Sequence, residues 1–265
     1  MATEIHPTAV IGEHAQIGDG VRIGPYAIVE DYAMIGDGTR IGAHATIHSY
    51  TRLGKDNQVF NYADVGGLPQ DLKFDGSETW LDIGDSNVIR EFATIHRSNN
   101  PREKTLVGHQ NFIMAYAHIA HNCVIGNHTI IVNYAGLSGH VEVEDRAFVS
   151  GGTLVHQFVK IGRLAMVGGA SRITQDILPY TMVAGNPAGF YGLNLVGLRR
   201  NQLGPTVRNA IKRAISTIRA GGSKDTILDR LAAREESALP EVQYIMDFVR
   251  RSNRGLLIRP ATDKE

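Results

Sequence analysis

The sequence of 265 residues contains only one cysteine, Cys123, and one tryptophan. A single cysteine excludes a disulfide within the chain, which fits a reducing compartment. No apolar run approaches the roughly 20 residues that a membrane-spanning helix needs. The first residues, M-A-T-E-I-H-P, lead directly into a repeat at Ile5, so they do not resemble a signal peptide. We therefore expect a cytoplasmic protein without a membrane span.

The sequence also lacks net charge, because its 27 basic and 27 acidic side chains cancel. Residues 195–265 nevertheless hold 14 Lys and Arg against 8 Asp and Glu, a net +6, which leaves −6 for the rest of the chain. Such a basic face is either simply solvated or the docking site of an acidic partner. The mild imbalance, without an aromatic platform, argues against a nucleic-acid partner.

What the chain does have is a repeat of six residues. Branched aliphatic residues recur at every sixth position from Ile5 to Val65, from Ile83 to Ile95 and from Val107 to Ile173, mostly with a small residue four positions later. This period fits neither a helix nor simple strand alternation, and it is typical of a parallel β-helix. Three hexapeptides form one triangular coil of 18 residues, and coils stack at about 4.8 Å.

The repeat predicts a mainly β protein with two domains. Residues 1–190 form the β-helix, which is interrupted near residues 66–82 and 98–105. Residues 191–265 form a small helical domain of three helices. Pro205 suits the start of the first helix, Ser223 caps the second, and Pro240 opens a third that stops near Gly255.

The stretch I-M-A-Y-A-H-I-A-H-N-C-V at 113–124 carries two histidines, His118 and His121, that the repeat does not require. Cys123 occupies a small-residue position, where it is either a buried corner residue or a catalytic thiol. We favour the buried residue.

A spacing of 18 residues stacks His121, Gly139 and Gln157 in one column, with His140 and His156 beside it. Because Gly139 has no side chain, it leaves a notch next to His121. The first interruption, with Gln70, Asp71 and Lys73, is able to fold over this face. Such a group suits a general base acting on a phosphate-bearing substrate, although the same residues also fit an ordinary solvated surface. His118 and His121 straddle a corner and no third histidine has a matching column, so we expect no metal site. No Gly-rich phosphate loop or CxxC motif appears, and we expect no cofactor.

Five motifs together resemble one known family, the cytoplasmic acyl-carrier-protein–UDP-N-acetylglucosamine O-acyltransferases, which catalyse the first step of lipid A biosynthesis. They are Q-D-L-K at 70–73, T-I-H-R at 94–97, A-H-I-A-H at 117–121, L-V-H-Q-F at 154–158 and G-L-R-R at 197–200. The resemblance spans essentially the whole chain. It implies a left-handed β-helix, a homotrimer with active sites between subunits, and a 3-hydroxyacyl carrier protein and UDP-N-acetylglucosamine as partners.

The resemblance also implies a role for each matching residue. His121 becomes the general base that activates the glucosamine 3-hydroxyl for direct attack on the thioester, and the N–H of Gly139 becomes an oxyanion donor. Asp71 would hold the acyl 3-hydroxyl beside Gln70 and Lys73. The remaining implied positions are the cleft residues His96, His118, His140, His156 and Gln157, the nucleotide contacts Asn194 and Arg200, and Gly169, which leaves room for a long acyl chain.

Two positions depart from the family pattern. Asn122 follows the base where an aspartate is usual, and an amide supplies no negative charge to an imidazolium. Val196 replaces a glutamate expected near the nucleotide.

Three other hypotheses remain open on the residues alone. An N-acyltransferase of the same fold, acting two steps later in the pathway, carries a sizeable N-terminal domain, whereas the repeat here begins at Ile5. A zinc enzyme related to carbonic anhydrase would need metal. A non-enzymatic scaffold would explain the repeat but neither the polar residues around His121 nor the two interruptions. The sequence sets neither the acyl length nor the choice between the sugar and its 3-amino analogue.

Overall fold

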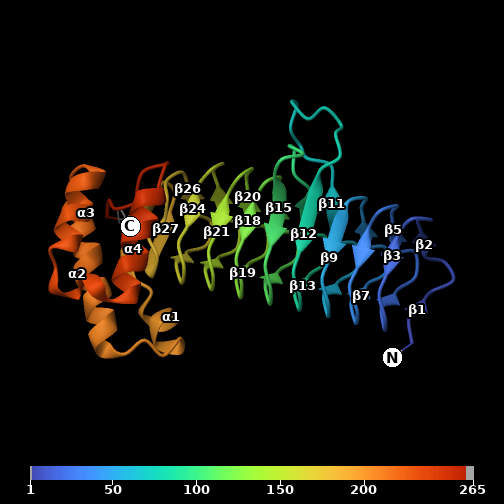
Figure 1. Ribbon diagram of the computed structural model, residues 1–265, viewed down its shortest axis with the longest axis horizontal. Coiled ribbons are helices and arrows are strands. Elements are labelled where there is room, and N and C mark those ends of the chain that lie inside the picture. The colour runs from blue at the N-terminus through green and yellow to red at the C-terminus, as the bar shows by residue number, and fades with distance from the viewer. Residues whose placement is uncertain (1, 261–265) are drawn as a thin grey trace.

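The computed structural model of the chain describes residues 2–260, which form a column of short strands with a group of helices at its C-terminal end (Figure 1). The column has three faces, and each face is one sheet whose strands stack in parallel coil upon coil. A final antiparallel hairpin extends the first face.

The bounds of the strands follow the three faces. The first face holds β1 (Glu4–Ile5), β4 (Arg22–Ile23), β7 (Arg40–Ile41), β10 (Gln58–Val59), β13 (Val88–Ile89), β16 (Phe112–Ile113), β19 (Ile130–Ile131), β22 (Phe148–Val149), β25 (Met166–Val167), β27 (Thr181–Gly185) and β28 (Ala188–Leu193). The second face holds β2 (Val10–Ile11), β5 (Ile28–Val29), β8 (Thr46–Ile47), β11 (Asp64–Gly67), β14 (Thr94–His96), β17 (His118–Ile119), β20 (Gly136–Leu137), β23 (Leu154–Val155) and β26 (Arg172–Ile173). The third face holds β3 (Gln16–Ile17), β6 (Met34–Ile35), β9 (Thr51–Leu53), β12 (Trp80–Ile83), β15 (Lys104–Val107), β18 (Val124–Ile125), β21 (Glu142–Val143) and β24 (Lys160–Ile161).

The hexapeptide pattern produces this column because each aliphatic residue points inward and stacks on its equivalents. Ile113 pairs with Ile131 in the next coil, 18 residues on, as the repeat predicts. Ile113 is fully buried, and so is the small residue Ala117 at the following corner. Each coil therefore buries its apolar side against its neighbours rather than against a separate core.

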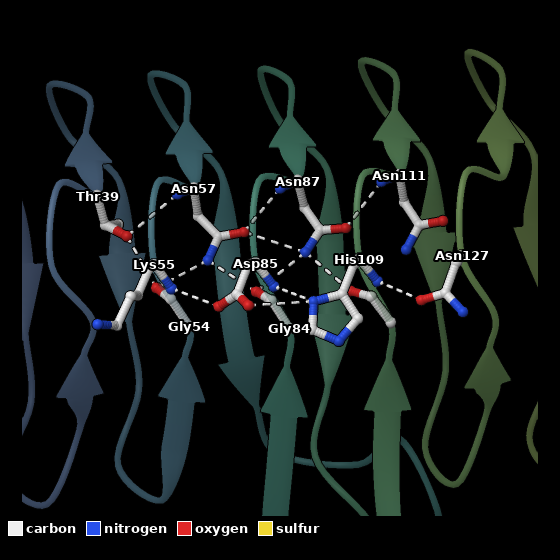
Figure 2. Close-up of polar contacts among 11 residues, drawn as sticks. Thr39, Gly54, Lys55, Asn57, Gly84, Asp85, Asn87, His109, Asn111 and Asn127 are labelled. Atoms are coloured by element: carbon white, nitrogen blue, oxygen red, sulfur yellow. Dashed lines mark hydrogen bonds and ion pairs between the residues drawn. The ribbon is translucent and has the colours of Figure 1, made fainter.

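A ladder of buried polar side chains runs along the corner between the third and first faces (Figure 2). Asn57 Oδ1 accepts hydrogen bonds from the N–H of Asn87 at 2.9 Å and from its Nδ2 at 3.0 Å. Asn87 Oδ1 in turn accepts from the N–H of Asn111 at 2.9 Å. The rungs are 30 and 24 residues apart here instead of 18, because the two interruptions lie between them. The interruptions therefore leave the stacking of the coils intact.

The two interruptions are shorter than the sequence suggests. β11 continues through Gly67 and β12 begins at Trp80, so the first insertion is the loop 68–79, which projects from the column (Figure 1). β15 begins at Lys104, so the second insertion is the loop 97–103. The break expected at 66–82 was too wide at both ends, and the break expected at 98–105 was too wide at its C-terminal end, because residues there still pair with neighbouring coils.

The C-terminal part contains α1 (Leu195–Arg200), α2 (Pro205–Arg219), α3 (Lys224–Ala232), the 3-10 turn η1 (Glu235–Ala238) and α4 (Pro240–Arg251). Pro205 opens α2, Ser223 caps α3 through a hydrogen bond from the N–H of Thr226, and Pro240 opens α4, as expected. The sequence missed α1 and placed the end of the last helix too late, near Gly255 instead of Arg251.

The chain returns to the column after α4. Asp176 Oδ2 accepts hydrogen bonds from Ser252 Oγ at 2.6 Å and from the N–H of Asn253 at 3.0 Å. β28 crosses residue 190, where the division into two domains was expected, and that division stays a prediction. Between residues 2 and 260, no helix combines the length and the apolar character needed to cross a membrane.

Candidate active site

His121 lies at the corner between the second and third faces, in the turn that joins β17 to β18. Gly139 occupies the same corner one coil later. The backbone N–H of the following residue, His140, donates a hydrogen bond to the carbonyl of His121. A Cβ added to Gly139 would lie 2.6 Å from Cε1 and 2.8 Å from Nε2 of His121. Any side chain at residue 139 would therefore displace the imidazole, so the notch predicted beside His121 is filled by its own ring.

The Asn122 side chain fixes the proton on the His121 ring. Asn122 Oδ1 accepts a hydrogen bond from the backbone N–H of Asn99 at 3.1 Å, and Nδ2 donates to Glu103 Oε2 at 2.6 Å. These partners leave one orientation for the amide. His121 Nδ1 lies 2.8 Å from Oδ1, so it donates the proton. The lone pair of the neutral ring is therefore on Nε2.

Two more histidines lie on the second face next to His121. The rings of His96 and His118 meet edge to face at 4.9 Å, and Thr94 Oγ1 lies 2.7 Å from Nδ1 of His118. Burial, together with the charge of His118, lowers the pKa of His96 to about 4. Burial also lowers the pKa of His118, with a further contribution from His121. Both rings are therefore suited to hydrogen bonding rather than to carrying charge.

His140 contacts His121 from the next coil. Its ring is perpendicular to that of His121, with centroids 5.5 Å apart, and it stacks on Phe158 at 4.6 Å. Burial lowers the pKa of His140, and the charge of His121 lowers it further. Glu103 lies 3.8 Å away and acts in the opposite direction.

The first insertion reaches this group through Asp71. Its Oδ2 accepts a hydrogen bond from Asn99 Nδ2 at 2.6 Å, and its Oδ1 accepts one from the N–H of Lys73 at 3.0 Å. The bonds from Lys73 and Asn99 lower the pKa of Asp71, and the charge of His121 adds to this effect. Gln70 and Lys73 are exposed on the same loop. A carboxylate on the loop is thus held within electrostatic reach of the imidazole.

Two predicted residues, His156 and Gln157, lie one coil beyond Gly139 and are exposed. His156 Nδ1 lies 3.2 Å from Nη2 of Arg254, which belongs to the segment that returns after α4. The C-terminal segment therefore borders the site, which the sequence did not suggest.

Three predicted residues are not brought to His121. Gly169 lies at the corner between the first and second faces, after β25. Asn194 caps α1, because its Oδ1 accepts from the N–H of Gly197 at 2.9 Å, and its Nδ2 donates to the carbonyl of Leu164. Asn194 and Arg200 line a groove of about 910 Å³ between α1 and the first face, with Arg146 and the exposed Val196.

Cys123 is fully buried, and burial raises the pKa of its thiol to about 12, so it fills a corner and is not a nucleophile. In the described part of the chain, no three His, Cys, Asp or Glu side chains are grouped so that they could hold a metal ion.

Sequence reasoning missed Ser98, Asn99 and Glu103, which surround Asn122. They lie in the second insertion, which was recognised only as a break. A signal was present: across this insertion the coils repeat every 24 residues, and Ser98 is 24 residues before Asn122.

Comparison with known proteins fits this arrangement. The family model "Udp N-acetylglucosamine O-acyltransferase; Domain 2" matches residues 176–257, and the model "Bacterial transferase hexapeptide (six repeats)" matches residues 104–139. A protein of Thiobacillus denitrificans named acyl-(acyl-carrier-protein)–UDP-N-acetylglucosamine O-acyltransferase is 48% identical over 97% of this chain and 100% of its own length. This chain belongs to that family of O-acyltransferases. A family member from Pseudomonas fluorescens is 50% identical over 95% of this chain and 98% of its own.

Solved structures of the family agree with the fold. The UDP-N-acetylglucosamine acyltransferase of Campylobacter jejuni superposes with a TM-score of 0.89 at 40% identity, covering 96% of this chain and 99% of its own. The Acinetobacter baumannii protein gives a TM-score of 0.92 at 38% identity with the same coverage. The predicted left-handed parallel β-helix with a small helical C-terminal part is confirmed. Family membership decides against the N-acyltransferase, the zinc enzyme and the scaffold.

Proposed function

We propose that this chain transfers a 3-hydroxyacyl group from acyl carrier protein to the 3-hydroxyl of UDP-N-acetylglucosamine, with His121 as the general base. The observation that carries the base assignment is the Asn122 amide, which keeps the His121 proton on Nδ1 and leaves Nε2 free to accept one. The substrates follow from the names of the family members. We assign the reaction to the first step of lipid A biosynthesis, in the cytoplasm.

In this mechanism His121 Nε2 removes the proton of the sugar hydroxyl while its oxygen attacks the thioester carbonyl. The N–H of Gly139 stabilises the oxyanion of the tetrahedral intermediate. That N–H is in no backbone hydrogen bond among residues 2–260. The carbon–sulfur bond then breaks, and the imidazolium returns its proton to the carrier's thiolate. No covalent enzyme intermediate forms.

The remaining residues bind and orient the substrates. Asp71 accepts a hydrogen bond from the acyl 3-hydroxyl, with Gln70 and Lys73 on the same loop. His96, His118 and His140 line the cleft as neutral rings, and burial of these rings supports this role. His156 and Gln157 extend the cleft by one coil, and Asn194 and Arg200 contact the nucleotide.

Gly169 limits the acyl length in this proposal. A Cβ at residue 169 would meet the Gly151 carbonyl at 3.4 Å and Ser150 Cβ at 4.0 Å, which are ordinary contacts, so a side chain would fit there and would occupy space that glycine leaves free. In this proposal the missing side chain favours a long acyl chain.

The basic C-terminal helices are the docking site proposed for the acidic carrier protein. A groove of about 510 Å³ beside α2 carries Arg199, Arg208, Lys212 and Arg219. Arg213, by contrast, is paired with Glu236 and is less available to a partner.

The acceptor and the reaction are tested together by product analysis. Purified protein is incubated with a panel of 3-hydroxyacyl carrier proteins and either UDP-N-acetylglucosamine or its 3-amino analogue. We expect an ester at the sugar 3-position, identified by mass spectrometry and by its lability to mild base. A base-stable amide, formed only with the amino sugar, would make the 3-amino analogue the acceptor in place of UDP-N-acetylglucosamine. No transfer to either sugar would refute the proposal.

A further inference from the structure

The hydrogen-bond chain that starts at His121 ends on a carboxylate. His121 Nδ1 donates to Asn122 Oδ1 at 2.8 Å, and Asn122 Nδ2 donates to Glu103 Oε2 at 2.6 Å. The second distance is that of a charge-assisted bond. When Nε2 takes up a proton, the imidazolium needs a compensating negative charge, which the neutral amide does not itself supply. Along this chain of hydrogen bonds, Glu103 supplies the carboxylate.

We propose that Glu103 is a positioning residue for the base, which acts on His121 through the amide of Asn122. Its carboxylate polarises the amide, holds it in one orientation and stabilises the imidazolium that forms during transfer. This inference rests on the proposed function of His121, and it assigns the negative charge to the second insertion rather than to residue 122.

The surroundings of Asn122 fit an amide and not a carboxylate. Asn122 is 5% exposed, and its side chain uses its full capacity for hydrogen bonds. Oδ1 accepts from His121 and from the N–H of Asn99, while Nδ2 donates to Glu103 and to Ser98 Oγ at 2.9 Å. An aspartate at 122 would place its second oxygen against the Glu103 carboxylate. Asn122 and Glu103 therefore form a matched pair that holds one negative charge between them.

Other titratable groups face this pair from each neighbouring element. Asp71 faces His121 from the first insertion, His118 faces it from β17, and His140 faces it from the next coil. Glu103 has His140 at 3.8 Å and shares a groove with Lys104 and Arg254. Asp71 is the competing source of negative charge, so Asp71→Asn belongs in the experiment.

The test is a double-mutant cycle of Glu103→Gln and Asn122→Asp, with kcat, the pH profile of kcat/KM and thermal melting measured on each protein. In the native background, Glu103→Gln should lower kcat about tenfold, the effect of losing one charge-assisted bond. It should also move the acid limb of the profile to lower pH, because the lost carboxylate no longer favours the protonated ring. In the Asn122→Asp background residue 122 carries the charge itself, so Glu103→Gln should cost less than about twofold. The matched control is Glu13→Gln, at an exposed residue in the N-terminal coils, which should change neither kcat nor the acid limb of the pH profile.

The outcomes separate this inference from the proposed function. An unchanged kcat and acid limb in Glu103→Gln, with turnover lost in His121→Ala, would overturn the role of Glu103 and leave the base in place. Equal losses in both backgrounds would mean that Glu103 only holds the loop, which also overturns it. A shift of the acid limb in Asp71→Asn but not in Glu103→Gln would transfer the role to Asp71. Near-normal turnover in His121→Ala would refute the base itself. Should Asn122→Asp melt early, the pH profile of Glu103→Gln alone decides.

Discussion

At the scale of single residues, burial decides the charge of the histidines around His121. His96 is 6% exposed and its Nδ1 has no hydrogen-bond partner within the described chain. Its folded pKa of about 4 lies below the ordinary 6.5, so the unfolded chain binds a proton more readily than the folded one between these values. The stability that neutral His96 allows is therefore present above pH 6.5 and lost as the pH falls toward 4.

We predict that this histidine makes the free energy of unfolding fall by up to about 3 kcal/mol between pH 6.5 and 4. In His96→Asn that part of the pH dependence should disappear, because the side chain no longer titrates. Urea unfolding at a series of pH values measures it, with His128→Gln at an exposed position as the control. An identical pH slope in wild type and His96→Asn would contradict the prediction.

The sequence predicted the column His121, Gly139 and Gln157 because a fixed 18-residue spacing converts directly into stacking. It did not predict Glu103 or Asn99, because the second insertion changes the local spacing and only the folded chain shows which residues then face Asn122. It also did not show that the Asn194 side chain caps α1.

At the scale of elements, the buried ladder at the corner between the third and first faces keeps the coils in register past two insertions. Asn87 is fully buried, and its Nδ2 donates to the carbonyls of Gly84 and Gly108 at 3.1 and 2.9 Å. Asn87→Ala would leave the Gly108 carbonyl and the N–H of Asn111 without these partners. We expect a loss of about 2–5 kcal/mol in the free energy of unfolding.

Denaturant unfolding measures this loss, and Asn61→Ala is the matched control. Asn61 also accepts a backbone hydrogen bond, from Ala43 at 3.0 Å, but it is exposed, so water replaces the bond. The control should lose about 1 kcal/mol or less. Equal losses of unfolding free energy at the two positions would show that the buried ladder stabilises the fold no more than an exposed turn does.

Elements outside the repeat were harder to predict. The hexapeptide period predicted the strands up to β26, whereas the β27–β28 hairpin follows no period and α1 is only six residues long. The contact of residues 252–254 with Asp176 spans about 76 to 78 positions, and no local pattern predicts such a pairing.

At the scale of the whole molecule, one copy of the chain holds the parts of the proposed site on different faces. His121 lies at the corner between the second and third faces, while Asn194 and Arg200 border a groove on the first. A column of exposed, stacked rings, including Tyr62, Phe92 and Tyr116, gives an apolar edge for lateral packing. On these two features we propose that the chain forms a homotrimer, in which clefts between copies complete the site.

We predict a particle of about 87 kDa, three times the 28.9 kDa of one chain, in light scattering at micromolar concentration. Turnover per chain should fall on dilution together with the mass, because a separated copy lacks one side of the cleft. A mass of 28.9 kDa with undiminished turnover would refute both the trimer and the shared site.

The most direct test of the account is the turnover of His121→Ala with 3-hydroxyacyl carrier protein and UDP-N-acetylglucosamine. We predict a loss of about 10²–10⁴-fold, as for removal of a general base, with melting close to wild type because the His121 ring packs outside the apolar interior. His118→Ala should lose less, since its ring only binds or orients. Near-normal turnover in His121→Ala would contradict the account, and melting far below wild type would make His121 a structural residue.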